Sequence, residues 1–342
     1  MGAFASTGIP MRAVLGLLFG ISVMLSFDAR AAGACEVLPP ASTTTYGQRI
    51  AAIACAEHTL WYRPFIDMDG RLASTNVSEA ESSRLADGST EPWRRVAMYW
   101  RDAGLDWRGS AMVDASTCAA PVTGGLTQSC RGTIVDNPWS AAFLSYVVSR
   151  AGVPGFRRSA SHADYVAQAY QSPDSPYSFH DPASIAPATG DMLCFVRASS
   201  TTLGHAGLRA HFDGNNGGLA MHCDVVVGFD GKKSRAYLVG GNVLQGVTMR
   251  ILPINRSGQF WSLPQRISST ACTPDNVEAC SFNRQDWVAL LKLKVADQAA
   301  PPWIPSTPMM STPRQDCCVN CVVGSGIPRC PVTPLQSPLP SG

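Results

Sequence analysis

The spacing of apolar residues divides the chain into a helical first part and a strand-rich second part. Between about residues 46 and 103, apolar positions recur at helical intervals in two groups, one around Ile50 and one around Val96. This spacing predicts two helices. A third, central helix is predicted over residues 137–152, because Pro138 stands near its start and a glycine stands at its end.

A fourth helix is predicted over residues 162–170, after which the pattern changes. Short runs rich in Val, Leu and Phe alternate with turn residues, which is typical of β-strands. We expect strands over residues 191–196, 222–229, 235–239, 247–252 and 287–293. Helices followed by strands predict an α+β fold with N-terminal helices, a central helix and an antiparallel sheet.

The first 31 residues have the layout of a secretory signal peptide. Arg12 precedes the apolar run from Ala13 to Phe27, and an Ala-x-Ala cleavage site ends at Ala31. A membrane anchor is the alternative, but it needs about 20 apolar residues and this run is shorter. Lipoprotein processing at Cys35 is disfavoured because charged residues separate that cysteine from the apolar run. We expect cleavage after Ala31, no stable membrane span afterwards, and a periplasmic or secreted protein.

The end of the chain differs from the middle in composition. From Ala299 onward Pro, Ser and Thr dominate, and such a segment cannot offset its ordering entropy by burial. We expect residues 299–342 to be a disordered tail and residues 32–298 to be one domain. With 45% hydrophobic residues that domain can build a large core. The net charge is +2 and no run of Lys and Arg forms a basic stripe, which argues against a nucleic-acid partner.

Twelve cysteines suit an exported chain, because thiols pair in an oxidising compartment. Proximity in sequence makes three pairings plausible: Cys35 with Cys55, Cys118 with Cys130, and Cys272 with Cys280. A fourth is expected between neighbouring strands, from Cys194 to Cys223, on the face opposite His222. Four further cysteines lie in the tail, where the adjacent Cys317 and Cys318 favour disulfides over a zinc site.

Three polar residues stand at positions that suit acyl-transfer chemistry. Ser140 lies in the first turn of the central helix, where the macrodipole favours an anion. His222 opens a strand and is placed to take the proton of Ser140. Asn242 ends the next strand, and a third polar group of this kind fixes the imidazole tautomer. This order of parts is similar to that of papain-like amidases, and the resemblance implies these three residues as a candidate triad.

The residues around these positions resemble those of papain-like cell-wall amidases. The segment Asn-Pro-Trp-Ser-Ala-Ala-Phe from Asn137 is similar to the Pro-Trp-Cys-Ala-Ala-Phe segment of NlpC/P60-like and CHAP-like hydrolases. Met221 to Gly228 is similar to their histidine strand, and Gly240-Gly241-Asn242 to their Gly-Gly-Asn segment. The version with serine resembles more closely the domain-of-unknown-function family 2272, over about residues 46–293. The resemblance implies a papain-like fold and peptidoglycan as the substrate, although the family label brings no established activity.

Serine in place of cysteine changes what the helix can contribute. A macrodipole is worth about 1 kcal/mol, which helps a thiol with a pKa near 8.5 but does little for an alcohol. Ser140 therefore depends on a base and an oxyanion hole. The alternative is that Ser140 only caps the helix, a role that serine fills well.

Other side chains compete for roles around this site. Asp224 shares a face of its strand with His222 and competes with Asn242 as the orienting group. His162 is either a partly buried histidine, a substrate contact or an alternative base, and Trp139 is a second candidate for substrate contact. A metal site at His162, His222 and Asp224 has no short ligand motif in its favour. We expect no metal and no cofactor.

These observations lead to a hypothesis and two rivals. The chain is expected to be an exported hydrolase of peptidoglycan peptide amide bonds, with Ser140 attacking, His222 as acid and base, and Asn242 or Asp224 orienting it. A catalytically inactive relative that binds cell-wall peptide or a protein partner is the first rival. A structural envelope protein held through its cysteine-rich tail is the second.

Overall fold

A computed structural model describes residues 2, 34–35, 45–107, 113–197, 202–214, 217–232, 234–266 and 271–302. The predicted signal peptide, apart from residue 2, lies outside the described residues. The tail from residue 303, with its four cysteines, also lies outside them. Within the described ranges, no helix combines the length and the apolar character that a membrane crossing requires.

The described part of the chain contains the four predicted helices, which begin close to their predicted positions, and further helices that were not predicted. They are α1 (Tyr46–Leu60), α2 (Pro92–Asp102), α3 (Ala115–Ala119), α4 (Gly125–Asp136), α5 (Ser140–Arg150), α6 (His162–Gln171), α7 (Gly204–Asp213) and the 3-10 helix Val277–Cys280. The predicted helices correspond to α1, α2, α5 and α6. A capping box formed by Thr45 and Gln48 starts α1, and Pro92 occupies the first turn of α2.

The strands form one mixed sheet. They are β1 (Phe65–Ile66), β2 (Leu72–Ala73), β3 (Tyr177–His180), β4 (Met192–Val196), β5 (Met221–Asp230), β6 (Arg235–Val243), β7 (Gly246–Pro253) and β8 (Asp286–Leu293). Their order in the sheet is β2-β1-β7-β6-β5-β4-β8-β3. The predicted strands correspond to β4 to β8, which pair antiparallel, whereas β1 pairs parallel to β7. The fold is therefore α+β, as predicted, with a sheet that is not purely antiparallel.

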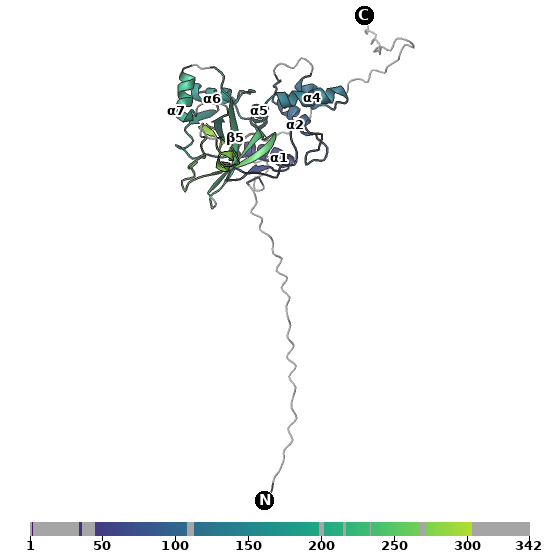
Figure 1. Cartoon of the computed structure of the whole chain (residues 1–342). Helices are drawn as coiled ribbons and strands as arrows, with labels where there is room; N and C mark the ends of the chain where they lie inside the picture. The colour runs from purple at the N-terminus through teal and green to yellow at the C-terminus, as the bar shows by residue number, and fades with distance from the viewer. Residues whose placement is uncertain are drawn as a thin grey trace, which may run out of the picture.

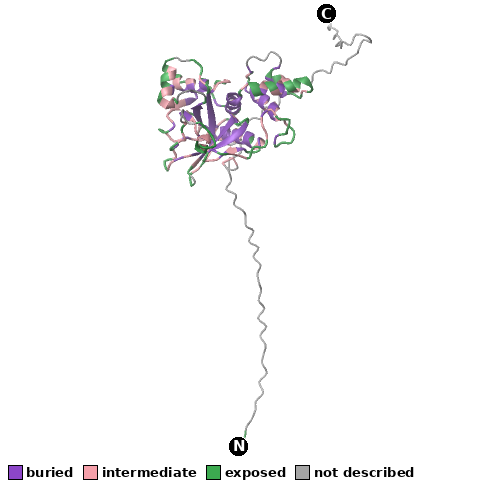
Figure 2. Ribbon diagram, in the orientation of Figure 1, coloured by how far each residue is buried: buried purple, intermediate pink, exposed green. Residues whose placement is uncertain are grey.

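Helices cover one face of this sheet, and loops cover much of the other. In Figure 1, β5 runs through the middle of the domain, with α6 and α7 on one side of it and α2 and α4 on the other. Helices α1, α5 and α6 pack against β5, and their apolar side chains join the main core. A smaller cluster around Leu193, Phe195 and Trp287 fills the opposite face. In Figure 2, α5 and much of the central strands are coloured as buried.

The four disulfides predicted for the described residues are all present. They join Cys35 to Cys55, Cys118 to Cys130, Cys194 to Cys223, and Cys272 to Cys280. Cys194 and Cys223 are directly opposite one another on β4 and β5, with their Cα atoms 4.0 Å apart. Both belong to the helix-facing core, while His222 contacts Phe195 on the other face. Strand alternation therefore separates the disulfide from the histidine.

The two ends of the described domain lie side by side. Tyr46 N–H donates to Gln298 O at 3.1 Å, and Gly47 N–H donates to Ala296 O at 3.0 Å. A Cβ on Gly47 would lie 2.3 Å from the backbone oxygen of Thr189 and 3.2 Å from that of Ala296, so a glycine is needed where α1 approaches these two segments. These contacts fix the start of α1 to the chain that follows β8.

Candidate functional site

The candidate nucleophile lies at the start of α5 in a position that leaves its hydroxyl free of capping. Trp139 is the N-cap residue, Ser140 is the first helical residue, and no side chain caps this helix end. The first intrahelical bond runs from Phe143 N–H to Trp139 O at 2.9 Å. The backbone N–H groups of Ser140 and the next two residues precede that bond. The alternative in which Ser140 serves only as the cap therefore does not describe this helix.

The hydroxyl of Ser140 is hydrogen-bonded to His162. Ser140 Oγ lies 2.8 Å from His162 Nε2, and His162 is the first residue of α6. Ser140 is 3% exposed and His162 is 4% exposed. The sequence placed His222 as the direct partner of Ser140, but the geometry differs, because the start of α6 brings His162 to that place. His162 had been only an alternative base.

His222 belongs to a second hydrogen-bonded group beside the first. Its Nε2 lies 2.7 Å from Asp224 Oδ1, and Arg250 Nε donates to Asp224 Oδ2 at 3.0 Å. Arg250 also donates to Asn283 Oδ1 at 2.9 Å. The rings of His162 and His222 are 5.0 Å apart between centroids. Two adjacent groups, Ser140 with His162 and His222 with Asp224 and Arg250, thus form the centre of the candidate site.

The protonation of these groups follows from burial and from their neighbours. Burial lowers the pKa of His162 well below its ordinary value of 6.5, and His222 acts in the same direction. The neutral ring can accept a proton from Ser140. Burial opposes the charge of Asp224, but His222 and Arg250 outweigh burial and hold the pKa of that carboxyl well below its usual range. Asp224 is therefore ionised near neutral pH.

Asn242 does not orient His222 in this arrangement. With its amide placed so that both atoms find partners, Asn242 accepts from Trp139 N–H at 3.2 Å and donates to Glu79 Oε2 at 3.2 Å. Asp224, the competing candidate, is the residue that bonds His222. Asn242 instead holds Trp139, the residue that precedes Ser140.

Trp139 lies inside the core rather than on an accessible surface. Its ring stacks on Trp61 and Tyr99 with centroids 5.7 Å away in each case. Its Nε1–H donates to Glu79 Oε2 at 2.6 Å. Burial raises the pKa of Glu79, although the bond from Trp139 lowers it in part. Sequence reasoning missed Glu79, because it comes from a loop with no motif and approaches α5 only in the fold.

The two residues before Asn242 are glycines because other side chains lie very close to their Cα atoms. A Cβ on Gly240 would lie 1.9 Å from Asp224 Oδ1, and one on Gly241 would lie 2.5 Å from the side chain of Phe143. Asn242 itself has a φ of 53°, which asparagine tolerates better than most residues, at an irregularity in the pairing of β6 and β7. This segment therefore lets α5 and the Asp224 carboxylate pack against β6.

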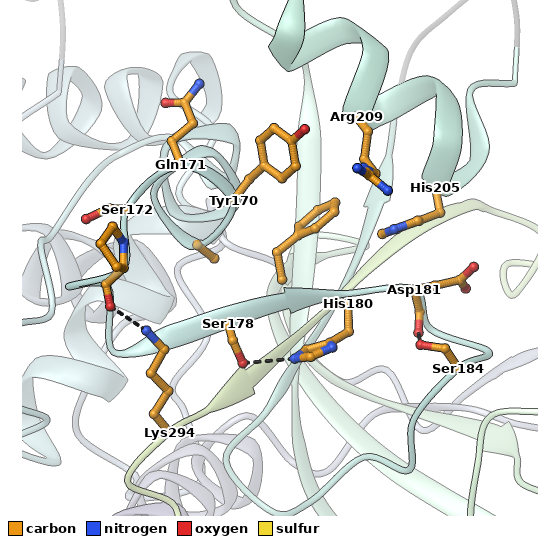
Figure 3. Close-up of a pocket in the computed structure, with 13 residues that line it drawn as sticks. Tyr170, Gln171, Ser172, Ser178, His180, Asp181, Ser184, His205, Arg209 and Lys294 are labelled. Carbon is orange, nitrogen blue, oxygen red and sulfur yellow. Dashed lines mark hydrogen bonds between the residues drawn. The ribbon is translucent and has the colours of Figure 1, made fainter.

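A small pocket opens beside this centre, and a larger cavity lies away from it. The small pocket has a volume of about 170 Å³ and includes His222 and Asn242 in its wall. The larger cavity, of about 720 Å³, contains none of the candidate residues. Figure 3 shows its walls, with Tyr170 from α6, His180 from β3 and Arg209 from α7. We place the site by its hydrogen-bonded groups rather than by cavity size. Among the described residues, no group of three or more His, Cys, Asp or Glu side chains is arranged to hold a metal.

Fold and site together define an α+β protein with a buried serine–histidine pair at the start of its central helix. The chain belongs to the DUF2272 family, described as an uncharacterized protein conserved in bacteria, whose family model matches residues 87–293. That range contains Ser140, His162, His222 and Asn242. Comparison with curated proteins and with solved structures found no match.

Proposed function

We propose that this protein is an exported amide hydrolase with a papain-like fold related to the NlpC/P60 type, acting on peptide bonds of peptidoglycan. The observation that carries the proposal is the 2.8 Å hydrogen bond between Ser140 Oγ and His162 Nε2 at the start of α5. A hydroxyl and a neutral imidazole at this distance have the geometry that a nucleophile and its base require in acyl transfer, which supports the proposal. The peptidoglycan substrate rests on the sequence resemblance.

In the proposed mechanism Ser140 is the nucleophile and His162 transfers the protons. Ser140 Oγ attacks the amide carbonyl carbon while its proton passes to His162 Nε2. The carbonyl oxygen then carries negative charge, which the free N–H groups and positive end of α5 stabilise. His162 gives its proton to the leaving amine as the C–N bond breaks, which leaves an acyl ester on Ser140. Water, deprotonated by His162, hydrolyses the ester and restores the serine.

The second histidine group assists without touching the nucleophile. Asp224 favours a positive charge on His162, whereas His222 opposes it. Because Arg250 and His222 hold Asp224 in place, its charge stays close to the pair of rings throughout the cycle. In this proposal Asp224 favours the protonated form of His162, His222 and Arg250 hold Asp224, and Asn242 positions the start of α5.

The disulfides support the part of the proposal that concerns location. Four disulfides join described residues, and such bonds form and persist outside the reducing cytoplasm. A signal peptide over residues 1–31 would deliver the chain to the periplasm or the exterior. Peptidoglycan is accessible to a protein in either place.

A second candidate function is favoured by the burial of the same residues. Ser140 and His162 are almost fully covered, and His162 Nδ1 has no hydrogen-bond partner in the part of the chain that the structure describes. An imidazolium formed there would lack the orienting acceptor of a serine-hydrolase triad. This favours a catalytically silent domain that binds cell-wall peptide or a protein partner.

Turnover separates the two candidates. Purified mature protein is incubated with peptidoglycan, and new amino termini are counted. The hydrolase proposal predicts release that Ser140→Ala and His162→Ala abolish, while Ser149→Ala, a change at a half-buried position near the other end of the same helix, leaves it intact. Binding of peptidoglycan without release in any variant would replace the hydrolase with the binding domain.

A further inference from the structure

The small pocket beside His222 has positively charged side chains and no acidic ones in its wall. Its wall combines two arginines, two amides and His222 with apolar side chains. It is lined by Ile66, Phe195, Arg197, His222, Asn242, Val243, Leu244, Arg250, Phe282 and Gln285. None of these residues is acidic. Two carboxylates bond to residues of the wall from behind it: Asp224 to His222 and Arg250, and Glu79 to Asn242.

Neither arginine is fully used by the protein. The guanidinium of Arg197, which follows β4, is exposed, and no described residue makes a hydrogen bond or ion pair with it. Arg250 is buried and donates Nε–H to Asp224 and Nη1–H to Asn283 Oδ1 and Phe282 O, while its Nη2 bonds to no described residue. A buried guanidinium with a free N–H beside an exposed one forms a ready site for an anion.

The arginines also lie close to the reacting groups. His222 is in the pocket wall, and its ring is 5.0 Å from that of His162. The positive charge of Arg197 also lowers the pKa of His162. Its effect is smaller than those of burial, His222 and Asp224. An anion in the pocket would therefore lie against His222, the ring beside His162, although Ser140 and His162 are not themselves in the pocket wall.

We propose that this pocket binds a carboxylate of the substrate, held by Arg197 at its mouth and Arg250 at its base. A volume of about 170 Å³ admits a carboxylate and a short stem, and Val243 and Phe195 contact that stem. The substrate class is thus an amide that carries a free carboxylate close to the scissile bond. This inference rests on the proposed function and specifies the class of substrate.

Binding tests the inference without requiring turnover. The probes are N-acetyl-alanyl-glutamate and the same peptide with both carboxylates converted to primary amides, titrated into the full mature chain carrying Ser140→Ala. We expect the amidated peptide to bind about tenfold more weakly, because charge-assisted hydrogen bonds are lost. Arg197→Gln should abolish this preference. Arg209→Gln, an exposed arginine in the wall of the larger cavity, should leave it unchanged.

Two results would overturn the inference. Equal binding of the two peptides is one, and a preference that survives Arg197→Gln is the other. Turnover of peptidoglycan, native and with its free carboxylates amidated, separates this inference from the hydrolase proposal. Carboxylate-selective binding with no turnover supports the pocket and removes the hydrolase. Equal turnover of native and amidated material supports the hydrolase and removes the pocket.

Discussion

Ser140 and His162 are each the first residue of a helix, and their side chains meet at 2.8 Å although 22 positions separate them in sequence. The start of α5 therefore faces the start of α6. Each side chain is held by a packed helix rather than by a loop. The hydroxyl and the ring are therefore kept within hydrogen-bond distance. This relationship is the basis of the mechanism proposed above.

Replacing Asp224 tests the second histidine group. Asp224→Ala removes the acceptor of both His222 and Arg250 and leaves a buried guanidinium without its counter-charge. We expect a loss of about 3–5 kcal/mol in the free energy of unfolding, measured by urea titration. The matched control is Asp69→Ala, which breaks an exposed ion pair with Arg71 and should cost less than about 1 kcal/mol. Equal losses in the two variants would contradict the role given to Asp224.

Replacing Gly240 tests the reason for the glycine pair. Gly240→Ala puts a methyl group 1.9 Å from Asp224 Oδ1, so the carboxylate or β6 must shift. We expect destabilisation of about 1–3 kcal/mol, together with a loss of any turnover. Gly217→Ala is the control, because a Cβ there meets nothing within 4 Å. The account of this segment fails if the two variants unfold at the same temperature.

Buried histidines predict how stability depends on pH. Burial lowers the pKa of His58 from 6.5 to about 4, and burial also lowers that of His162. Between pH 6.5 and pH 4 the unfolded chain therefore binds protons that the folded chain does not. The free energy of unfolding is highest above pH 6.5 and decreases as the pH falls toward 4. His58 alone should cost about 2 kcal/mol between pH 7 and pH 5.

Chemical denaturation at several pH values measures this effect. His58→Gln keeps a side-chain N–H that can reach Pro64 O, the present partner of His58 Nε2. The variant should show a smaller loss of stability in acid than the wild-type chain. An identical loss would show that His58 is not the group responsible.

Some of the site was predictable from local sequence rules. The period of two along a strand places His222 and Asp224 on one face and Cys223 on the other, and both the 2.7 Å bond and the disulfide with Cys194 agree. The helix start before Ser140 was visible from its proline and apolar spacing. The His222–Asp224 bond and the helix start depend on neighbours within a few residues, and the disulfide, which joins cysteines 29 positions apart, follows from the same alternation on two adjacent strands.

The rest depends on how the elements pack. His162 meets Ser140 because α6 folds back across the start of α5, and no spacing in the sequence encodes that approach. Glu79 bonds Trp139 across 60 positions from a loop. The short strands β1 and β2 have two residues each, which is too few for a pattern to appear. Tertiary contacts therefore decide which polar groups become partners.

The measurement that tests the central claim most directly is the reactivity of a thiol at position 140. In Ser140→Cys, the α5 dipole and the nearby His162 should lower the pKa of the introduced thiol below 8.5, so that alkylation remains fast near neutral pH. Rates are followed against pH by mass spectrometry of the peptide that contains position 140. Combining the change with His162→Ala should raise that pKa, whereas combining it with His205→Ala, in the wall of the larger cavity, should not. An ordinary thiol pKa near 8.5 in all three proteins would contradict the Ser140–His162 pair.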